Sequence, residues 1–329
     1  GFLSALSIQV IGNSDFYNGA FSAEYTNALS GIFDLHMRNG NNQQHEHTFQ
    51  IGLWGIDVAS EGPVGRKNGS SYLFNYRFSA NNLNLGHNFR LNYQDLELKF
   101  NYPTKRGGTF AVWGLGLTDV NRYNGKRKEK WETYSDRMSA RNEFEKFTGG
   151  LTHTYMVNEK TYLRSTLSFT YAFDRILTDL HTLEDERIAA EDISNRNGNM
   201  VFKAYMNRKA GPKHTNRSGF TVTALGYDLD YRVSPNFGLN KPAERIVEGR
   251  GESLVVSAFS NSLFDLNSRL TATTGLSSQY FTLNKKFSLE PRVALKWRPD
   301  FQQSFALAYG LHSRREKLDY YFVEKEVHG

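Results

Sequence analysis

Apolar and polar side chains alternate along several stretches of this 329-residue chain. In residues 71–78, Tyr72, Phe74, Tyr76 and Phe78 occupy every second position, and the positions between them are mostly polar. The same alternation occurs in residues 95–102, 163–173, 269–280, 289–298 and 304–311. Because successive side chains of a β-strand point to opposite sides, this period of two predicts strands with one apolar face and one polar face.

The lengths of these strands and of their links distinguish two all-β architectures. The predicted strands run to about ten residues, whereas strands of soluble sheets usually have about five or six. Short links at 103–108, 158–160, 265–268 and 299–303 alternate with long polar links at 79–90, 119–146, 174–199 and 232–252. Only the short link at 282–286 breaks this order. Because membrane barrels have short turns on one side and long loops on the other, the pattern favours an antiparallel transmembrane β-barrel over a soluble sandwich.

A change of parity occurs within residues 48–59. Phe49 and Ile51 share one parity, while Ile56 and Val58 share the other. Either a β-bulge or a tight hairpin at residues 53–55 would produce this switch, and the hairpin fits the alternation of the links better. Counting the hairpin gives about 12–13 strands, with boundaries uncertain by a few residues each.

Composition excludes other classes. The chain is 14% aromatic, has 28 Gly but 7 Pro, and has a mean hydropathy of −0.57. It is too aromatic for a disordered chain, and it lacks the run of about 18 apolar residues that a transmembrane helix requires. Its first residues lack the basic region and cleavage site of a signal peptide, so we expect interior sequence of a longer precursor. The absence of cysteine is compatible with passage through an oxidising periplasm.

Motifs for chemistry are weak. The chain contains neither a G-x-S-x-G nor an H-E-x-x-H pattern, and the Gly114-Leu115-Gly116 triplet lacks the third glycine of a dinucleotide site. His45 and His47 could bind a metal, but no further ligand is evident nearby in the sequence, so a surface role is favoured. We therefore expect neither an enzyme nor a cofactor site.

Two charged runs lie in the predicted long links. Residues 126–131, KRKEKW, and the net charge of +6 could indicate binding to nucleic acid or to lipopolysaccharide phosphate. Neighbouring acidic residues balance the run, so we favour a solvated loop touching anionic lipid headgroups and expect no nucleic-acid partner. Residues 183–193 are acidic and could form a short helix or bind calcium, but a solvated loop is favoured.

Several short sequences carry a family resemblance. They are EYTNALSGIFD at 24–34 within the longer stretch 19–40, FQIG at 49–52, EGP at 61–63, NYQDL at 92–96 and EPR at 290–292. In this order they resemble the end of the plug domain and the first barrel strands of a TonB-dependent outer-membrane receptor, most similar to those of Bacteroidetes-type bacteria. The resemblance covers nearly the whole chain, and its specific motifs are concentrated in residues 19–100.

The resemblance implies how the chain is divided. Residues 1–44 would be the C-terminal end of the plug and its hinge, and residues 45–329 the N-terminal part of the barrel. Barrels of this family close with 22 strands, so the implied barrel is incomplete. The TonB box and most of the plug would precede Gly1.

Eight charged residues are candidates for contacts between plug and barrel or with a solute in the lumen. Asp34 and Arg38 lie near the implied hinge, although a solvated or paired structural position is favoured over a plug contact for both residues. The alternation predicts that the other six point into the barrel, where most of them would pack against the plug. These six are Arg77, Arg164, Asp228, Asp230, Arg292 and Lys296.

The function implied by the resemblance is transport across the outer membrane of a Gram-negative cell. The receptor would bind a scarce extracellular ligand and import it with force transmitted by the TonB complex. The ligand could be a small molecule, a glycan or a peptide, and the expected partners are outer-membrane lipid, lipopolysaccharide and a surface lipoprotein. The alternatives are a passive porin or adhesin barrel, which would lack the plug-like segment, and a soluble β-sandwich glycan-binding module.

Overall fold

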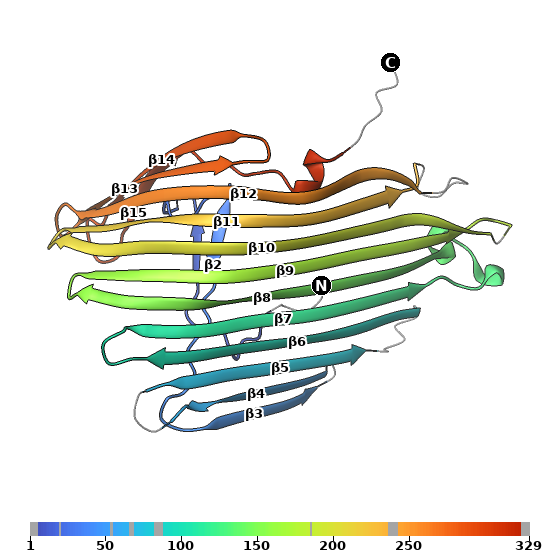
Figure 1. Cartoon of the computed structure of the whole chain (residues 1–329), viewed down its shortest axis with the longest axis horizontal. Coiled ribbons are helices and arrows are strands. Elements are labelled where there is room, and N and C mark those ends of the chain that lie inside the picture. The colour runs from blue at the N-terminus through green and yellow to red at the C-terminus, as the bar shows by residue number, and fades with distance from the viewer. Residues whose placement is uncertain are drawn as a thin grey trace, which may run out of the picture.

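A computed structural model describes residues 6–19, 21–52, 55–65, 69–81, 88–184, 186–235 and 243–323. Figure 1 shows a molecule built almost entirely of long antiparallel strands, which form one large sheet of 13 strands. Each strand of this sheet pairs with the strand that follows it in the chain, so the order in space is the order in sequence. The all-β class and the predicted strand number are therefore confirmed.

The sheet begins with a short hairpin and has its longest strands in the middle. Its first five strands are β3 (Glu46–Gly52), β4 (Gly55–Pro63), β5 (Ser71–Asn81), β6 (Asn88–Pro103) and β7 (Thr109–Asn124). Next come β8 (Met138–Asn158), β9 (Thr161–His181), β10 (Arg187–Gly211), β11 (His214–Val233) and β12 (Glu244–Asp265). The last three are β13 (Leu270–Phe281), β14 (Lys286–Trp297) and β15 (Phe305–Gly310).

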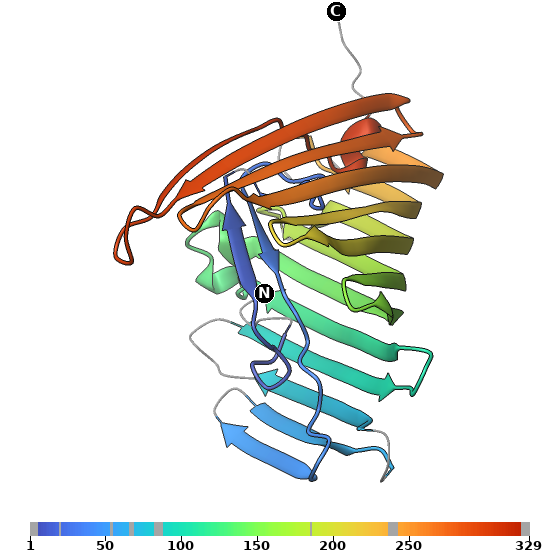
Figure 2. The same cartoon turned by 90° about the vertical axis from the view of Figure 1, so that its left-hand side faces the viewer.

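A second, two-stranded ladder joins β1 (Asp15–Asn18) and β2 (Gly31–Asp34). It belongs to the N-terminal segment, which we define as residues 6–44. Figure 2 shows this ladder in front of the concave side of the large sheet. We call this side the inner face and the opposite side the outer face. Three short 3-10 helices complete the described structure: η1 (Lys128–Lys130), η2 (Tyr134–Arg137) and η3 (Leu318–Tyr321).

The register confirms the predicted alternation. Phe74 lies opposite Leu98 between β5 and β6, while Asn75 lies opposite Glu97. Large apolar side chains of the outer face remain exposed, for example Phe147 at 47% and Met200 at 57%. No second sheet covers them among the described residues, so the sandwich alternative is wrong for this chain. A contiguous exposed apolar surface of this kind requires an apolar medium or a partner.

The apolar band of the outer face does not extend along the whole length of the longest strands. Along β8, outward Phe147 is followed toward the long link by Glu145 and Glu143. On β9 the apolar band ends at Phe173, and the next outer-face residue toward the long link is Arg175. At this end of the sheet the outer face carries charged side chains, as expected where that face of a sheet is exposed to water.

One of the predicted long loops is largely strand. β9 continues to His181 and β10 already begins at Arg187, so most of residues 174–199 belong to a ladder. The short helix suggested for residues 183–193 is wrong for the described part, in which Glu191 and Asp192 are strand residues. The strands continue to pair beyond the apolar band. There the side chains no longer alternate between apolar and polar, so the sequence pattern does not predict these parts of the strands.

The predicted hairpin near residue 53 is confirmed, because Gly52 pairs with Gly55 between β3 and β4. In Figure 1 the links after β7, β9 and β11 gather at one end of the sheet, opposite the turns after β6, β8 and β10. Residues 82–87 and 236–242, within two of the predicted long links, lie outside the described residues.

Buried apolar clusters are small. Leu225, Val255 and Phe281 form one cluster on the inner face, and Leu318 and Tyr321 of the C-terminal part pack on it. Tyr227, Leu229 and Val247 form the other, against which Phe322 packs. Within the described ranges, no helix is both long enough and apolar enough to cross a membrane.

Candidate functional site

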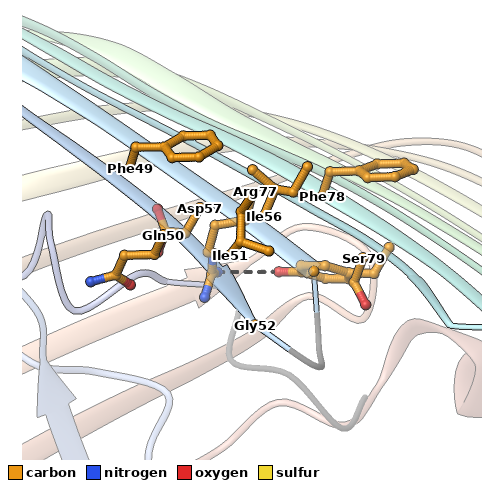
Figure 3. Close-up of a pocket in the computed structure, with 11 residues that line it drawn as sticks. Phe49, Gln50, Ile51, Gly52, Ile56, Asp57, Arg77, Phe78 and Ser79 are labelled. Atoms are coloured by element: carbon orange, nitrogen blue, oxygen red, sulfur yellow. Dashed lines mark hydrogen bonds between the residues drawn. The ribbon is translucent and has the colours of Figure 1, made fainter.

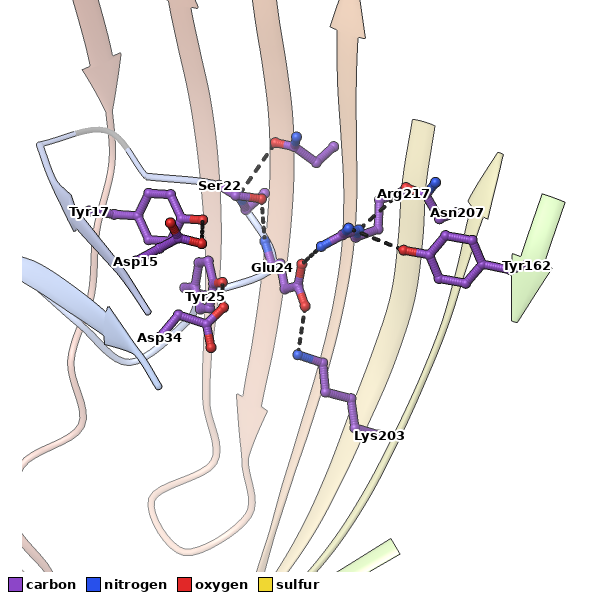
Figure 4. A network of polar contacts seen from close by, with 12 residues as sticks. Asp15, Tyr17, Ser22, Glu24, Tyr25, Asp34, Tyr162, Lys203, Asn207 and Arg217 are labelled. Carbon is purple, nitrogen blue, oxygen red and sulfur yellow. Dashed lines mark hydrogen bonds and ion pairs between the residues drawn. The ribbon is translucent and has the colours of Figure 1, made fainter. Parts of the chain in front are cut away.

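The N-terminal segment contacts the inner face mainly through charged and polar groups. Glu24 is the centre of one contact, shown in Figure 4. Its carboxylate accepts from Lys203 Nζ on β10 and from Arg217 Nη1 on β11, each at 2.8 Å. The Glu24 side chain is only 7% exposed. Burial alone would raise the pKa of Glu24, but the two cations outweigh burial and lower it, so the carboxylate is charged at neutral pH.

A second contact joins the end of the N-terminal segment to β4. Arg38 donates two hydrogen bonds to the carboxylate of Glu61, both of 2.6 Å, and the backbone N–H of Asn41 donates a third of 2.7 Å. Such a bidentate pair between a guanidinium and a carboxylate restricts both position and orientation. It therefore holds the chain where it passes from the N-terminal segment into the sheet.

Arg292 on β14 makes the most extensive contact. Its Nη1 donates to the backbone carbonyls of Phe21, Ser22 and Tyr25, at 3.2, 2.7 and 2.8 Å. Its Nη2 forms a salt bridge of 2.7 Å with Glu290, and both side chains are almost completely buried, at 3% and 4% exposed. Because an isolated charge would be costly there, the guanidinium depends on this full set of acceptors.

Two further contacts join the N-terminal segment to β6. Lys99 Nζ donates to the carbonyl of Met37 at 2.6 Å. The backbone N–H of Ser7 donates to Glu97 Oε1 at 2.7 Å. The segment is thus held at β4, β6, β10, β11 and β14, across nearly the full width of the sheet.

Asp34 is paired within the N-terminal segment itself. Its carboxylate accepts from the hydroxyl of Tyr25 at 2.5 Å and lies 3.4 Å from His36 Nε2. Burial raises the pKa of Tyr25, and the hydrogen bond and charge of Asp34 raise it further, so the hydroxyl remains a donor. Asp34 therefore stabilises the link between β1 and β2 and does not contribute to the contact with the large sheet.

A cavity of about 690 Å³ lies on the inner face between β8–β11 and residues 315–319. Asn195, Asn197 and Asn199 of β10 line it, and Asn27 at the tip of the N-terminal segment lies at its border. Asn27 has a left-handed backbone, with φ of 60°. Its Oδ1 accepts the N–H of Arg315 at 2.8 Å, which ties the tip to residues 315–319.

Figure 3 shows a second hollow, of about 610 Å³, at the corner formed by β3, β4 and β5. Phe49, Ile51 and Phe78 of the outer face and Gln50 and Asp57 of the inner face all line it. Because β3 is an edge strand, paired only with β4, this hollow lies around the open side of the sheet. We interpret it as an open corner of the sheet and not as a ligand site.

Comparison with solved structures identifies the architecture. The chain is similar to the pyoverdine outer membrane receptor FpvA of Pseudomonas aeruginosa PAO1, with a TM-score of 0.69 and 8% identity over 91% of this chain and 51% of that one. It is also similar to the siderophore receptor PiuA of Acinetobacter baumannii, with a TM-score of 0.62 and 9% identity over 92% and 54%. It is similar as well to the FrpB iron transporter of Neisseria meningitidis, with a TM-score of 0.62 and 12% identity over 94% of this chain and 54% of that one.

The chain has the fold of a TonB-dependent outer-membrane receptor. It spans about half the length of the structures it matches, so its sheet corresponds to part of a receptor barrel. No protein-family model matches the chain, and no curated protein matches it in sequence.

The other candidates of the barrel sheet differ in their surroundings. Arg77 pairs with Asp95 of the neighbouring strand at 2.5 and 3.0 Å. Arg164 faces inward on β9 and lines a cavity of about 410 Å³ together with Lys203 and Arg217. Lys296 lies on the inner face of β14, near the edge of the sheet, between Thr271 of β13 and Ala306 of β15.

The expected inward position is wrong for Asp228 and Asp230. In the ladder between β10 and β11, Asp228 lies opposite Arg196 and shares the outer face with it. Asp230 pairs on that face with Arg232 and Arg245, each at 3.1 Å.

The physical reason is a reversal of polarity along β11. Beyond the apolar band the outer face of this fold meets water, so carboxylates are tolerated there. The inner positions next to them, Leu225, Tyr227 and Leu229, are apolar because residues 318–322 cover them. A rule that places apolar side chains outward therefore gives the wrong face for this part of the strand.

Five residues of the interface are not among the eight charged candidates predicted from the sequence. These are Glu24, Glu61, Lys203, Arg217 and Glu290. The alternation of side chains could have indicated that Lys203 points inward, because its neighbours Phe202 and Ala204 lie on the outer face. Three or more His, Asp or Glu side chains arranged to hold a metal ion are not found in the described part of the chain.

Proposed function

We propose that the chain is part of a TonB-dependent receptor in the outer membrane of a Gram-negative bacterium. In this proposal residues 1–44 are the end of the plug and its hinge, and residues 45–329 are the N-terminal part of the barrel. The long links face the outside of the cell, where they bind a scarce ligand together with the tip of the plug. TonB then acts on a plug segment outside this chain, and the ligand enters as the plug moves.

The observation that carries this proposal is the polar interface between the N-terminal segment and the inner face. Glu24, Arg38 and Arg292 join the two parts through ion pairs and backbone acceptors. Groups of this kind can exchange their partners for water at a modest net cost, whereas an apolar core cannot. Such an interface suits a plug that is held in position at rest and released by force. A passive porin or adhesin would not need it.

The outer face supports the membrane location. Its exposed aromatic and aliphatic side chains, such as Phe100, Phe169 and Phe202, suit contact with lipid. The charged side chains beyond them, including Arg175 and Arg196, would lie level with lipopolysaccharide headgroups. A surface lipoprotein that covers the long links remains part of the proposal, as a partner of the ligand-binding side.

The proposal is tested with the full-length protein in a Gram-negative host, with and without TonB. We expect binding of ligand to whole cells in both strains and accumulation inside only with TonB. A liposome swelling assay supplies the comparison, because a closed plug should give no passive flux. Passive flux together with TonB-independent uptake would instead identify a porin.

A further inference from the structure

The short turns of the sheet form a basic rim. We define the short-turn rim as residues 103–108, 158–160, 208–213, 265–269 and 298–303, which contain the turns after β6, β8, β10, β12 and β14. Because every strand pairs with the next one in the chain, these turns lie at one end of the sheet (Figure 1). We propose that the short-turn rim binds the phosphate groups of anionic phospholipids in the periplasmic leaflet of the outer membrane. This inference rests on the proposed membrane location and orientation, and adds a lipid partner to the proposed function.

The first argument is an excess of unpaired positive charge. The short-turn rim contains eight Lys and Arg but only three Asp and Glu. All eight cationic side chains are exposed, and within the described ranges none of them forms an ion pair. At the opposite end of the sheet, by contrast, Arg187 pairs with Asp179 and Arg245 with Asp230. Like charges without protein partners repel one another, so the rim suits an anionic partner.

The second argument is that neighbouring turns are joined into a continuous row. Backbone hydrogen bonds of 2.8 Å run from the N–H of Lys209 to the carbonyl of Lys160, from Asp265 to Lys213 and from Arg298 to Arg269. The basic residues of successive turns therefore follow one another along the rim. A membrane surface presents many phosphate groups side by side, so several of them can contact such a row at once, whereas a single small anion cannot.

The third argument is continuity with the apolar outer face. Aromatic pairs lie on this face next to the rim: Phe110 with His153, His214 with Phe264 and Trp297 with Phe305. Lys213 directly precedes His214, and Arg298 directly follows Trp297. Aromatic belts of membrane barrels lie at the level of the lipid headgroups. The basic residues are therefore placed beside lipid phosphate, which favours a lipid over an acidic protein as the partner.

The test measures lipid binding to the purified full-length protein in a neutral detergent by native mass spectrometry. The probes are phosphatidylglycerol, cardiolipin and phosphatidylcholine with matched acyl chains. We expect both anionic lipids to bind more tightly than phosphatidylcholine, and added salt to weaken this preference. The triple variant Arg208→Gln, Lys209→Gln, Lys213→Gln should weaken anionic lipid binding about tenfold or more, because each Lys or Arg near an anionic surface contributes about fivefold.

A matched control removes the same charge at the other end of the sheet. Arg127, Lys128 and Lys130 are exposed in the link between β7 and β8. The triple variant Arg127→Gln, Lys128→Gln, Lys130→Gln should change the affinity for anionic lipid less than about twofold. If the β10 turn variant fails to fold, the double variant Lys160→Gln, Arg269→Gln decides the matter, since it removes two other rim charges and should weaken binding about fivefold or more.

Equal binding of phosphatidylcholine and the anionic lipids would overturn the inference, and so would anionic lipid binding that survives both rim variants. An equal loss of binding in the control variant would also reject it, because net charge and not the rim would then be recognised. TonB-dependent uptake by a receptor that lacks lipid preference would reject the rim site alone and leave the proposed transport function intact. Lipid binding at the rim together with TonB-independent uptake would support the site and reject the transport function.

Discussion

At the scale of single residues, buried charges at the interface each have several partners. Arg292 is surrounded by three carbonyls and Glu290, and Glu24 lies between Lys203 and Arg217. When one charged side chain is removed, the groups that bonded to it lose that partner without regaining water. This loss costs more free energy than the intact pair contributes to stability. The interface is therefore specific in position although its net stability is modest.

Glu24 provides the first test of this interface. Glu24→Gln should destabilise docking of the N-terminal segment by about 1–3 kcal/mol, an estimate reduced because Lys203 and Arg217 are partly exposed. Combined with Lys203→Met, the effects should be less than additive in a double-mutant cycle, measured by protease sensitivity of the segment. Strict additivity would show that the ion pair contributes nothing.

Acid should act on the same contact. The folded-state pKa of Glu24 is lowered, so the stabilisation is present above the unfolded pKa and is lost as the pH falls through the folded value. The protease sensitivity of the wild-type segment should therefore rise on acidification more than that of Glu24→Gln.

The outer face offers a second test at this scale. Phe74→Arg should cost about 2–4 kcal/mol if the side chain lies near the middle of the bilayer, while Phe74→Leu should cost little. The measurement is refolding of the full-length barrel into lipid vesicles across a urea series. Asn75 is unsuitable as a neutral comparison, because it is buried and donates to Asp57 at 2.6 Å. Equal stability of the Arg and Leu variants would contradict a lipid-facing position.

At the scale of elements, the strands near the middle of the sheet continue beyond the apolar band and carry the polar links away from it. The link between β7 and β8 shows how such a link is ordered. Asp136 accepts from the backbone N–H groups of Glu132 and Thr133 and from Lys126 Nζ, at 2.9, 3.0 and 3.0 Å. The backbone N–H of Glu132, then Lys126 and then Thr133 lower the pKa of Asp136, so the link should be ordered at neutral pH.

The orientation of the elements can be tested by labelling. The chain has no native cysteine, so single cysteines give an unambiguous signal. Lys128→Cys, in the link after β7, should react with a membrane-impermeant thiol reagent on intact cells. Lys105→Cys, in the turn after β6 at the other end of the sheet, should react only after the outer membrane is permeabilised. The reverse pattern would invert the proposed topology.

At the scale of the whole molecule, the sheet has two open edges, β3 and β15. Backbone groups unpaired in hydrocarbon cost several kcal/mol each, because no water is present to bond them. The apolar outer face adds a large surface that water cannot solvate favourably.

The 329 residues expressed alone should therefore aggregate or require denaturant, whereas the full-length protein should fold in detergent. Size-exclusion chromatography with light scattering distinguishes the two results. A monodisperse folded monomer of the 329 residues in plain buffer would contradict a membrane-barrel fold with two unprotected edges.

The sequence by itself determined the apolar parts of the strands, their outer face and the hairpin between β3 and β4, because the period of two is a local property of the chain. Only the tertiary structure decided which inner charges meet the N-terminal segment, since Glu24 and Lys203 are 179 positions apart. It also decided the orientation of Asp228 and Asp230, because solvent covers their face and residues 318–322 cover the other. Burial by distant segments reverses polarity without altering the period of two, so the pattern reveals the strand but not its environment.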